Sequence, residues 1–153
     1  MLRLVVGVVD VYIVDPREQL RVLLLRRAPG TRCTGAWEVV HGRLRDGELP
    51  EDGAEREVME ETGLVLDRLY NVTCQPFYLH GSATVQMAVV FAGFADRRSS
   101  LRLSQEHDAA EWYEVDGALK RLTWPRSKQA LRDIQALLGG GDAGPVEDVL
   151  RVR

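Results

Sequence analysis

The chain has 153 residues, a net charge of −3, 45% hydrophobic residues and 28% charged residues. This length suits one domain whose core needs no disulfide bonds. A weakly acidic protein has no general attraction for a nucleic-acid backbone, so we expect no nucleic-acid partner. The two cysteines, Cys33 and Cys74, match neither a disulfide framework nor a metal-binding spacing, which predicts reduced thiols and a cytoplasmic location. The apolar N-terminus is interrupted by Asp10 and is too short to span a bilayer, so no membrane partner is expected.

The first third of the chain is rich in β-branched residues and is punctuated by turn residues. It predicts three strands, at Leu2–Val14, Leu20–Leu25 and Trp37–Val40. The first two strands are joined by a short turn at 15–18, so we expect them to form a hairpin. A loop at 28–36 and a turn-rich stretch at 41–49 flank the third strand.

The segment Pro50–Thr62 predicts the first helix. Proline suits the first helical turn, where Glu51 and Asp52 also interact favourably with the helix dipole. Gly63 follows as a C-terminal stop.

The second half of the chain predicts strands and one more helix. The strands are expected at Leu66–Leu79, Ala83–Phe94 and Ala110–Val115, and apolar residues at helical spacing place the helix at Trp124–Leu138. Strands mixed with two helices predict an α/β fold, with a sheet covered on both faces. The glycine-rich residues 139–153 are expected to form a flexible tail with a docking segment at Val149–Val152.

Three glutamates on the first helix carry an unfavourable arrangement of charge. Glu57 lies three residues before Glu60 and four before Glu61, so the carboxylates converge and repel one another. They also lie in the C-terminal half of the helix, where the dipole disfavours negative charge. An acidic surface helix is a common structure, and three glutamates alone favour that interpretation. A hard divalent cation prefers oxygen ligands, so a bound cation would turn the repulsion among these carboxylates into a net attraction.

The residues around these glutamates form a longer pattern. Gly42 is followed by five residues and Glu48, and seven more residues lead to Arg56 and Glu57. An apolar residue, the pair of glutamates, Gly63 and an apolar residue complete the pattern, which runs GRLRDGELPEDGAEREVMEETGL over residues 42–64. Seven fixed residues and two apolar positions would match by chance in about one of ten million chains of this length.

Residues 42–64 resemble the Nudix box, Gx5Ex7REUxEExGU with U apolar, at every fixed position. This resemblance implies a Nudix fold, which is an α/β/α sandwich around a mixed β-sheet. We therefore expect a Nudix hydrolase domain at 1–138, followed by the tail at 139–153. The family cleaves a nucleoside diphosphate linked to another group, with Mg²⁺ or Mn²⁺ and an attacking water.

The resemblance also implies roles for the residues of the box. Glu57, Glu60 and Glu61 are similar to its metal ligands, and Glu60 is also one candidate for the catalytic base. Arg56 resembles the residue that orients Glu57. The remaining fixed positions are structural: Glu48 braces the loop against the helix, and Gly42 and Gly63 shape the two loops.

Beyond the box, the chain is similar to the branch that contains dihydroneopterin triphosphate and dATP pyrophosphohydrolases. In that branch a glutamate followed by a histidine supplies a further metal ligand or a base, and Glu106 matches this glutamate. Trp112 matches the tryptophan on the strand that follows. His41 departs from the family, because many members carry a glycine at this position.

Several residues are candidates for binding the substrate. One of Arg26 and Arg27 is expected to hold a phosphate, because adjacent strand residues point to opposite faces. Aromatic rings that could stack on a base are those of Trp37, Phe77, Tyr78 and Trp124. We predict hydrolysis of a nucleoside triphosphate or a related diphosphate.

Two alternatives remain open at this point. One is hydrolysis of ADP-ribose or of a dinucleoside polyphosphate, and the other is a non-catalytic Nudix-fold module that binds a nucleotide or RNA. The family resemblance also allows a homodimer, although the sequence contains no interface signal.

Overall fold

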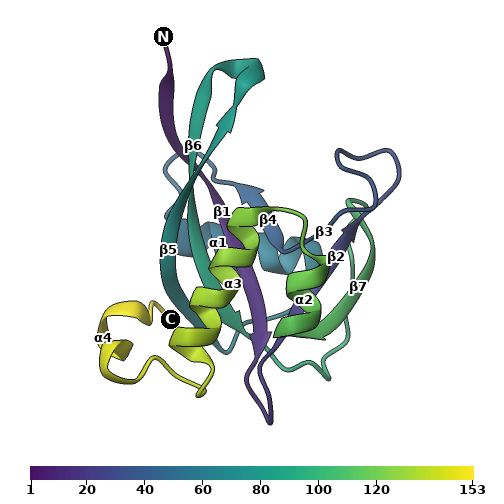
Figure 1. Ribbon diagram of the computed structural model, residues 1–153, viewed down its shortest axis with the longest axis vertical. Coiled ribbons are helices and arrows are strands. Elements are labelled where there is room, and N and C mark those ends of the chain that lie inside the picture. The colour runs from purple at the N-terminus through teal and green to yellow at the C-terminus, as the bar shows by residue number, and fades with distance from the viewer.

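A computed structural model describes residues 1–153 as seven strands in one mixed sheet with helices on both sides (Figure 1). The strands are β1 (Arg3–Asp15), β2 (Arg21–Arg27), β3 (Trp37–Glu38), β4 (Val40–Arg43), β5 (Arg68–Leu79), β6 (Thr84–Phe94) and β7 (His107–Glu114). Strand β1 pairs in parallel with β6 and antiparallel with β2 and β4. Strand β6 pairs antiparallel with β5, and β2 pairs antiparallel with β3 and β7.

Strand β1 lies in the centre of the sheet, between β2 and β6, and its residues from Val8 to Asp15 are buried there. Its alternating side chains divide the interior into two apolar clusters, with Tyr12 on one face of the sheet and Val11 on the other. A run of valine and isoleucine is typical of a strand that is covered on both faces. The sheet is therefore the middle layer of a sandwich.

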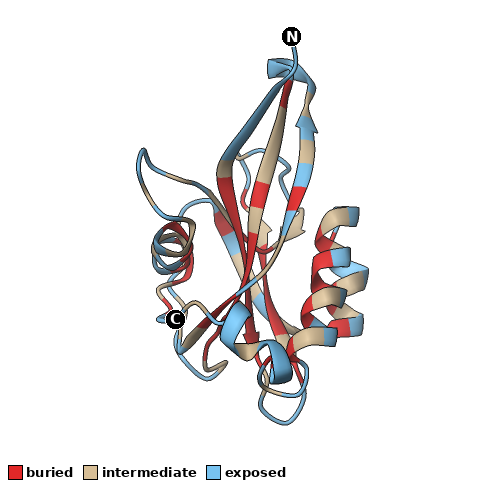
Figure 2. Ribbon diagram, turned by 90° about the vertical axis from the view of Figure 1, so that its left-hand side faces the viewer, coloured by how far each residue is buried: buried red, intermediate tan, exposed pale blue.

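Helix α1 (Pro50–Thr62) covers one face, and α2 (Val115–Arg121) and α3 (Pro125–Leu138) cover the other. Figure 2 shows the sheet edge-on between these two layers, with the buried sides of the helices turned toward it. None of the helices combines the length and the apolar character that a crossing of a bilayer requires.

The predicted α/β sandwich with a mixed sheet is confirmed. The bounds of the first helix are also confirmed, and the first two strands form an antiparallel hairpin, although only at Val14↔Val22 and Asp15↔Arg21. Farther from the turn, β1 pairs with β4 in place of β2.

Two local predictions were wrong. Residues 41–43 were predicted as part of a turn-rich stretch, but they continue β4 because they pair with Val8–Asp10 of β1. Helix α2 was not predicted at all. It is only seven residues long, and Val115 and Ala118 pack on the core that α3 also covers, so tertiary packing stabilises it more than local propensity does.

Residues 139–153 fold back onto the edge of the sheet. They contain the short helices η2 (Gly144–Val146) and α4 (Glu147–Leu150), and Tyr70 donates a hydrogen bond to Glu147 at 2.9 Å. The predicted docking of Val149–Val152 is confirmed for Val152, whose N–H donates to the carbonyl of Leu69 at 2.8 Å. The division of the chain at residue 138 into a domain and a tail stays a prediction.

Candidate active site

Helix α1 places its three C-terminal glutamates in different surroundings. Glu57 and Glu61 are one helical turn apart and turn toward the protein, whereas half of the Glu60 side chain is exposed. The helix ends at Gly63, which adopts a left-handed conformation with φ of 73°. The loop before β7 then returns to this end, since the N–H of Ser104 donates to the carbonyl of Glu61 at 3.4 Å.

Arg56 is the centre of an ion-pair network within the box. It donates to both oxygens of Glu48, at 2.7 and 2.8 Å, and to Glu57 at 2.7 Å. Its hydrogen bonds, together with the N–H of Arg45, lower the pKa of Glu48 to about 2. Glu60 accepts from Arg56 and from Arg45, both at 3.2 Å. The loop before the helix is thereby tied to the middle of the helix.

The glycine that opens the box lies directly against Glu57. A Cβ atom on Gly42 would overlap the carboxyl group and Cγ of Glu57, so only glycine leaves room for that side chain. Burial raises the pKa of Glu57, and the hydrogen bond from Arg56 offsets this rise only in part. The structure thus holds the Glu57 carboxylate between a backbone that approaches closely and one guanidinium group.

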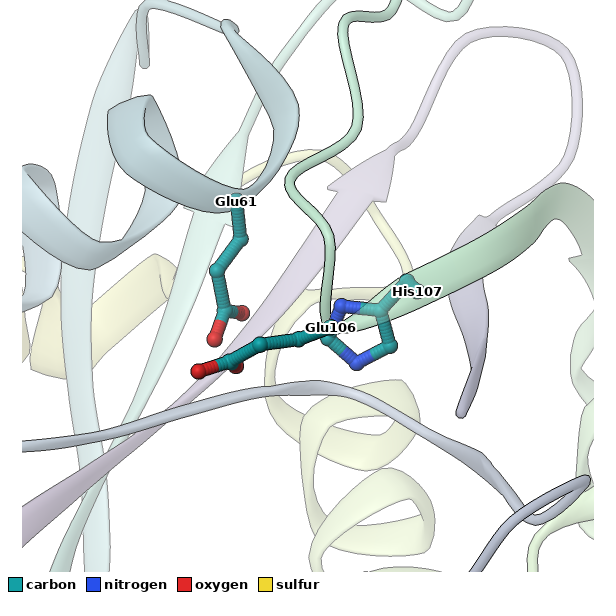
Figure 3. A group of neighbouring side chains, drawn as sticks. All are labelled: Glu61, Glu106 and His107. Carbon is teal, nitrogen blue, oxygen red and sulfur yellow. The ribbon is translucent and has the colours of Figure 1, made fainter. Parts of the chain in front are cut away.

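Glu61 meets residues from a distant part of the chain. Single ligand atoms of Glu61, Glu106 and His107 lie within 4.8 Å of one another (Figure 3). Glu61 is 4% exposed, and its Oε2 atom has no hydrogen-bond partner. Burial raises the pKa of Glu61 to about 9, with further contributions from the charges of Glu106, Glu57 and Glu38. A buried, unpartnered oxygen beside other carboxylates fits a divalent cation, which prefers such donors.

Sequence analysis did not identify Glu38, although it belongs to this cluster. Its carboxylate lies 2.8 Å from Nε2 of His107 and accepts from Arg27 at 3.2 Å. Arg27 also lies 4.0 Å from Glu106. The alternation of side chains along β3 could have indicated it, because Trp37 and Glu38 must face opposite sides of the sheet.

Three of the residues predicted to bind the substrate, Arg26, Trp37 and Tyr78, make their contacts outside the cluster of glutamates. Arg26 donates to Asp108 at 2.8 Å and stacks on Trp37. Trp37 packs against the apolar cluster on the face of the sheet that α2 and α3 cover. Its ring is edge-on to that of Tyr113, with 5.8 Å between the ring centroids. Tyr78 is exposed near the end of β5, in the β5–β6 hairpin that projects beyond the body of the sheet (Figure 1).

His41 takes part in a second polar cluster, on the α3 side of the sheet. It lies within hydrogen-bonding distance of the buried carboxylate of Asp10, which also accepts from Arg126. The Arg126 guanidinium stacks on Phe77, 4.5 Å from the ring centroid. Burial alone would raise the pKa of Asp10, but His41 and Arg126 together lower it. This cluster is fully paired.

Comparisons with known proteins agree with the architecture. A protein from Myxococcus xanthus named octanoyltransferase is 38% identical over 117 residues, which are 74% of this chain and 32% of that protein. The oxidized purine nucleoside triphosphate hydrolase of Mus musculus is 32% identical over 69% of this chain and 65% of its own length. The structure of a MutT protein from Methanosarcina mazei superposes with a TM-score of 0.71 at 25% identity, covering 88% of this chain and 95% of that one. The matched region therefore spans about a third of the length of the Myxococcus protein and about two thirds of the length of the Mus protein.

The molecule is an α/β/α sandwich with a cluster of carboxylates at the C-terminal end of one helix. The sequence pattern of the NUDIX domain matches residues 3–134, and the chain belongs to this family. None of the relatives described above is named for dihydroneopterin triphosphate or dATP, so membership of that branch stays a prediction.

Proposed function

We propose that the chain is a hydrolase that cleaves a phosphoanhydride bond of a nucleoside triphosphate or a related nucleoside diphosphate derivative, with Mg²⁺ or Mn²⁺. The observation that carries this proposal is the buried side chain of Glu61, whose Oε2 atom has no hydrogen-bond partner, beside the carboxylate of Glu106. Both residues are acceptors when ionised, and a buried carboxylate beside a second, partly exposed carboxylate is unfavourable without a cation. Glu57, one turn away on the same helix, completes the acidic surface.

A divalent cation, when bound, neutralises charge on the phosphoryl oxygens and lowers the pKa of the attacking water. Glu57, Glu61 and Glu106 would hold it, and Arg56 positions Glu57 while it ties Glu48 to the helix. Sequence analysis gave Glu60 as a further metal ligand and as a candidate base. In this structure its carboxylate accepts from two arginines, so both of its oxygens already have a hydrogen-bond partner within the chain.

Glu106 is the better candidate for the base. Its side chain is 56% exposed, so water reaches it, and it lies next to Glu61. A carboxylate in this position can accept the proton of the attacking water as the new bond to phosphorus forms. Glu106 is then a ligand or a base, and the pH dependence of turnover distinguishes these roles.

The contacts with the substrate are proposed from position and charge. Arg27 lies near Glu106 and Glu38 and is the candidate for holding a phosphate, whereas Arg26 is paired with Asp108. Trp37 and Tyr78 remain candidates for stacking on a base, although Trp37 packs on the face of the sheet that α2 and α3 cover and Tyr78 is exposed near the end of β5. The relative named oxidized purine nucleoside triphosphate hydrolase supports a purine nucleoside triphosphate as substrate. The dihydroneopterin triphosphate or dATP branch, the cytoplasmic location and a homodimer stay predictions.

The test is release of pyrophosphate or phosphate from a panel of nucleotides, with and without Mg²⁺. The panel includes nucleoside triphosphates, oxidized purine nucleoside triphosphates, ADP-ribose and dinucleoside polyphosphates, so it also tests the alternative substrates. We expect Mg²⁺-dependent turnover that Glu57→Gln and Glu61→Gln abolish. Glu55→Gln is the matched control, because Glu55 is an exposed glutamate of the same helix.

Two outcomes would contradict the proposal. Full activity of Glu61→Gln would exclude the assigned cation site. Nucleotide binding without turnover of any compound in the panel would favour the non-catalytic binding module.

A further inference from the structure

One side chain at the acidic cluster offers a nitrogen atom that could ligate a metal ion. His107 is the first residue of β7, its side chain is fully buried, and its Nδ1 atom has no hydrogen-bond partner. One of its ring nitrogens lies within 4.8 Å of a carboxylate oxygen of Glu61 and of Glu106. Figure 3 shows the imidazole ring beside the two carboxylates.

The hydrogen bond at the other side of the ring determines which nitrogen is free. Nε2 of His107 lies 2.8 Å from the carboxylate of Glu38. Glu38 also accepts from Arg27, so its carboxylate is an acceptor on both sides, and Nε2 is the ring nitrogen that donates to it. Nδ1 then carries a lone pair and cannot donate.

Two buried atoms without a hydrogen-bond partner therefore lie at this point, namely Nδ1 of His107 and Oε2 of Glu61, beside the exposed carboxylate of Glu106. Buried polar atoms without a partner are unfavourable, and a bound cation would satisfy both of them. A carboxylate that accepts the second N–H of a histidine is the usual support of a metal-binding imidazole, since it fixes both the tautomer and the ring orientation. Glu38 occupies this supporting position.

We propose that His107 is a ligand of the cation through Nδ1, so that Glu61, Glu106 and His107 form a mixed carboxylate–imidazole site. This proposal rests on the proposed function, because it concerns the same cation. Mg²⁺ prefers oxygen ligands, whereas imidazole favours transition-metal ions. The site then binds Co²⁺ more tightly relative to Mg²⁺ than a site of carboxylates alone does.

The test is pulsed electron paramagnetic resonance of the full chain, stripped with a chelator and loaded with Mn²⁺. A histidine ligand gives electron spin-echo modulation from ¹⁴N, which changes to the ¹⁵N pattern when histidine is labelled. The chain has only three histidines, so single variants assign the signal. We expect the histidine modulation in the unmodified protein and in His80→Gln, since His80 lies in the exposed turn η1 (His80–Ser82). We expect it to be lost in His107→Gln.

A competition experiment measures the consequence for metal preference. Co²⁺ is displaced by Mg²⁺ while the visible absorption of Co²⁺ is recorded. The ratio of the Mg²⁺ and Co²⁺ dissociation constants is expected to fall by roughly tenfold or more in His107→Gln and to be unchanged in His80→Gln. Because the labelled and unlabelled unmodified proteins are compared directly, the spectroscopic test does not depend on the folding of a variant.

The outcomes separate this proposal from the proposed function. Mn²⁺ bound without histidine modulation means that only oxygen atoms ligate it, which overturns the role of His107 and leaves the proposed function intact. Failure of Mn²⁺ to bind at all overturns both proposals.

Discussion

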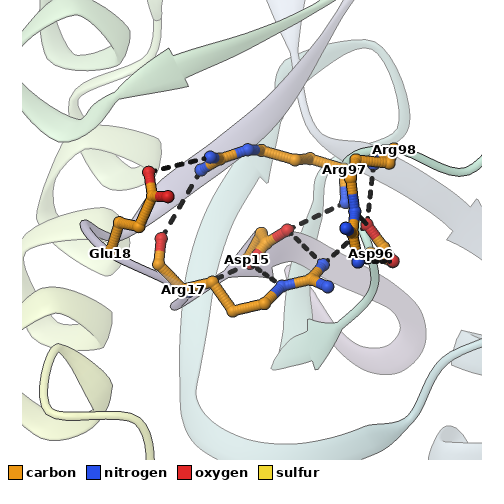
Figure 4. Close-up of polar contacts among 6 residues, drawn as sticks. All are labelled: Asp15, Arg17, Glu18, Asp96, Arg97 and Arg98. Carbon is orange, nitrogen blue, oxygen red and sulfur yellow. Dashed lines mark hydrogen bonds and ion pairs between the residues drawn. The ribbon is translucent and has the colours of Figure 1, made fainter.

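The pKa values of two buried carboxyl groups in this molecule are shifted in opposite directions, although the two residues are buried to nearly the same extent. Asp15 is 0% exposed and Glu61 is 4% exposed. Burial raises the pKa of both, but Asp15 accepts hydrogen bonds from Arg17 and from the N–H of Arg97, which lower its pKa to about 2 (Figure 4). The neighbours of Glu61 are other carboxylates, and its pKa rises to about 9.

The comparison teaches that burial alone does not identify a functional carboxylate. The cluster around Asp15 is electrostatically complete, because Arg17 also pairs with Asp96 at 2.7 Å. Glu61 itself has no ion pair, although Arg27 pairs with Glu38 nearby, and perturbed carboxylates of this kind are concentrated at functional sites. Substitutions in the two clusters should therefore have opposite consequences.

The largest expected effect is that of Glu61→Gln on turnover. Loss of this ligand should reduce kcat/KM by roughly a thousandfold or more, because the cation supplies several kcal/mol of charge stabilisation. The same change should raise the melting temperature of the metal-free protein near neutral pH, because Glu61, with its pKa raised to about 9, must take up a proton on folding and glutamine need not. Steady-state kinetics and calorimetry check the two effects. A destabilised metal-free Glu61→Gln would contradict the comparison.

The second prediction concerns the pH dependence of stability without metal. The pKa of Glu61 is raised to about 9 in the folded protein, from a usual value of 4.5. The contribution of Glu61 to the free energy of unfolding is complete below the unfolded pKa. It is lost as the pH rises toward 9, and the free energy of unfolding then falls by up to about 1.4 kcal/mol per pH unit. Denaturant titrations from pH 5 to 9 measure this slope, which Glu61→Gln should remove. Asp15 behaves oppositely, because its lowered pKa contributes stability that is lost as the pH falls toward 2.

A smaller effect is expected when the position of Glu57 is disturbed but its charge is kept. In Gly42→Ala the new methyl group would overlap the Glu57 carboxyl group, so that group must move. We expect metal affinity to fall by about 10–100-fold, the range for positioning residues of metal sites. Gly81→Ala is the control, because its Cβ would meet no atom within 4 Å. Isothermal titration with Mn²⁺ measures both, and equal affinities would show that Glu57 adapts freely.

The smallest effect is predicted for the paired cluster. Asp15→Asn removes charged hydrogen bonds and should lower the free energy of unfolding by about 1–3 kcal/mol, without a change in metal affinity. Asp96→Asn should have a smaller effect, since a third of the Asp96 side chain is exposed to water, whereas Asp15 is fully buried. Denaturant unfolding and Mn²⁺ titration distinguish the two variants. A large loss of metal affinity in Asp15→Asn would show that the clusters are coupled.

Local sequence determined the helix that carries the site. Proline in its first turn, glycine at its end and the spacing of Ala54 and Val58 predict Pro50–Thr62, and the structure has these bounds. The side chains of Glu57 and Glu61 share a direction because four residues are about one helical turn. The antiparallel pairing of β1 with β2 followed from local turn chemistry in the same way.

Only the tertiary structure decided which of these charges lack a partner. Glu60 pairs with Arg45, 15 residues away, and His107 meets Glu38 across 69 residues. No periodicity in the sequence specifies such contacts, because they depend on how β3, β7 and the loops around α1 pack. Burial then sets the pKa of each carboxylate through the groups that surround it, and that environment exists only when the chain is folded.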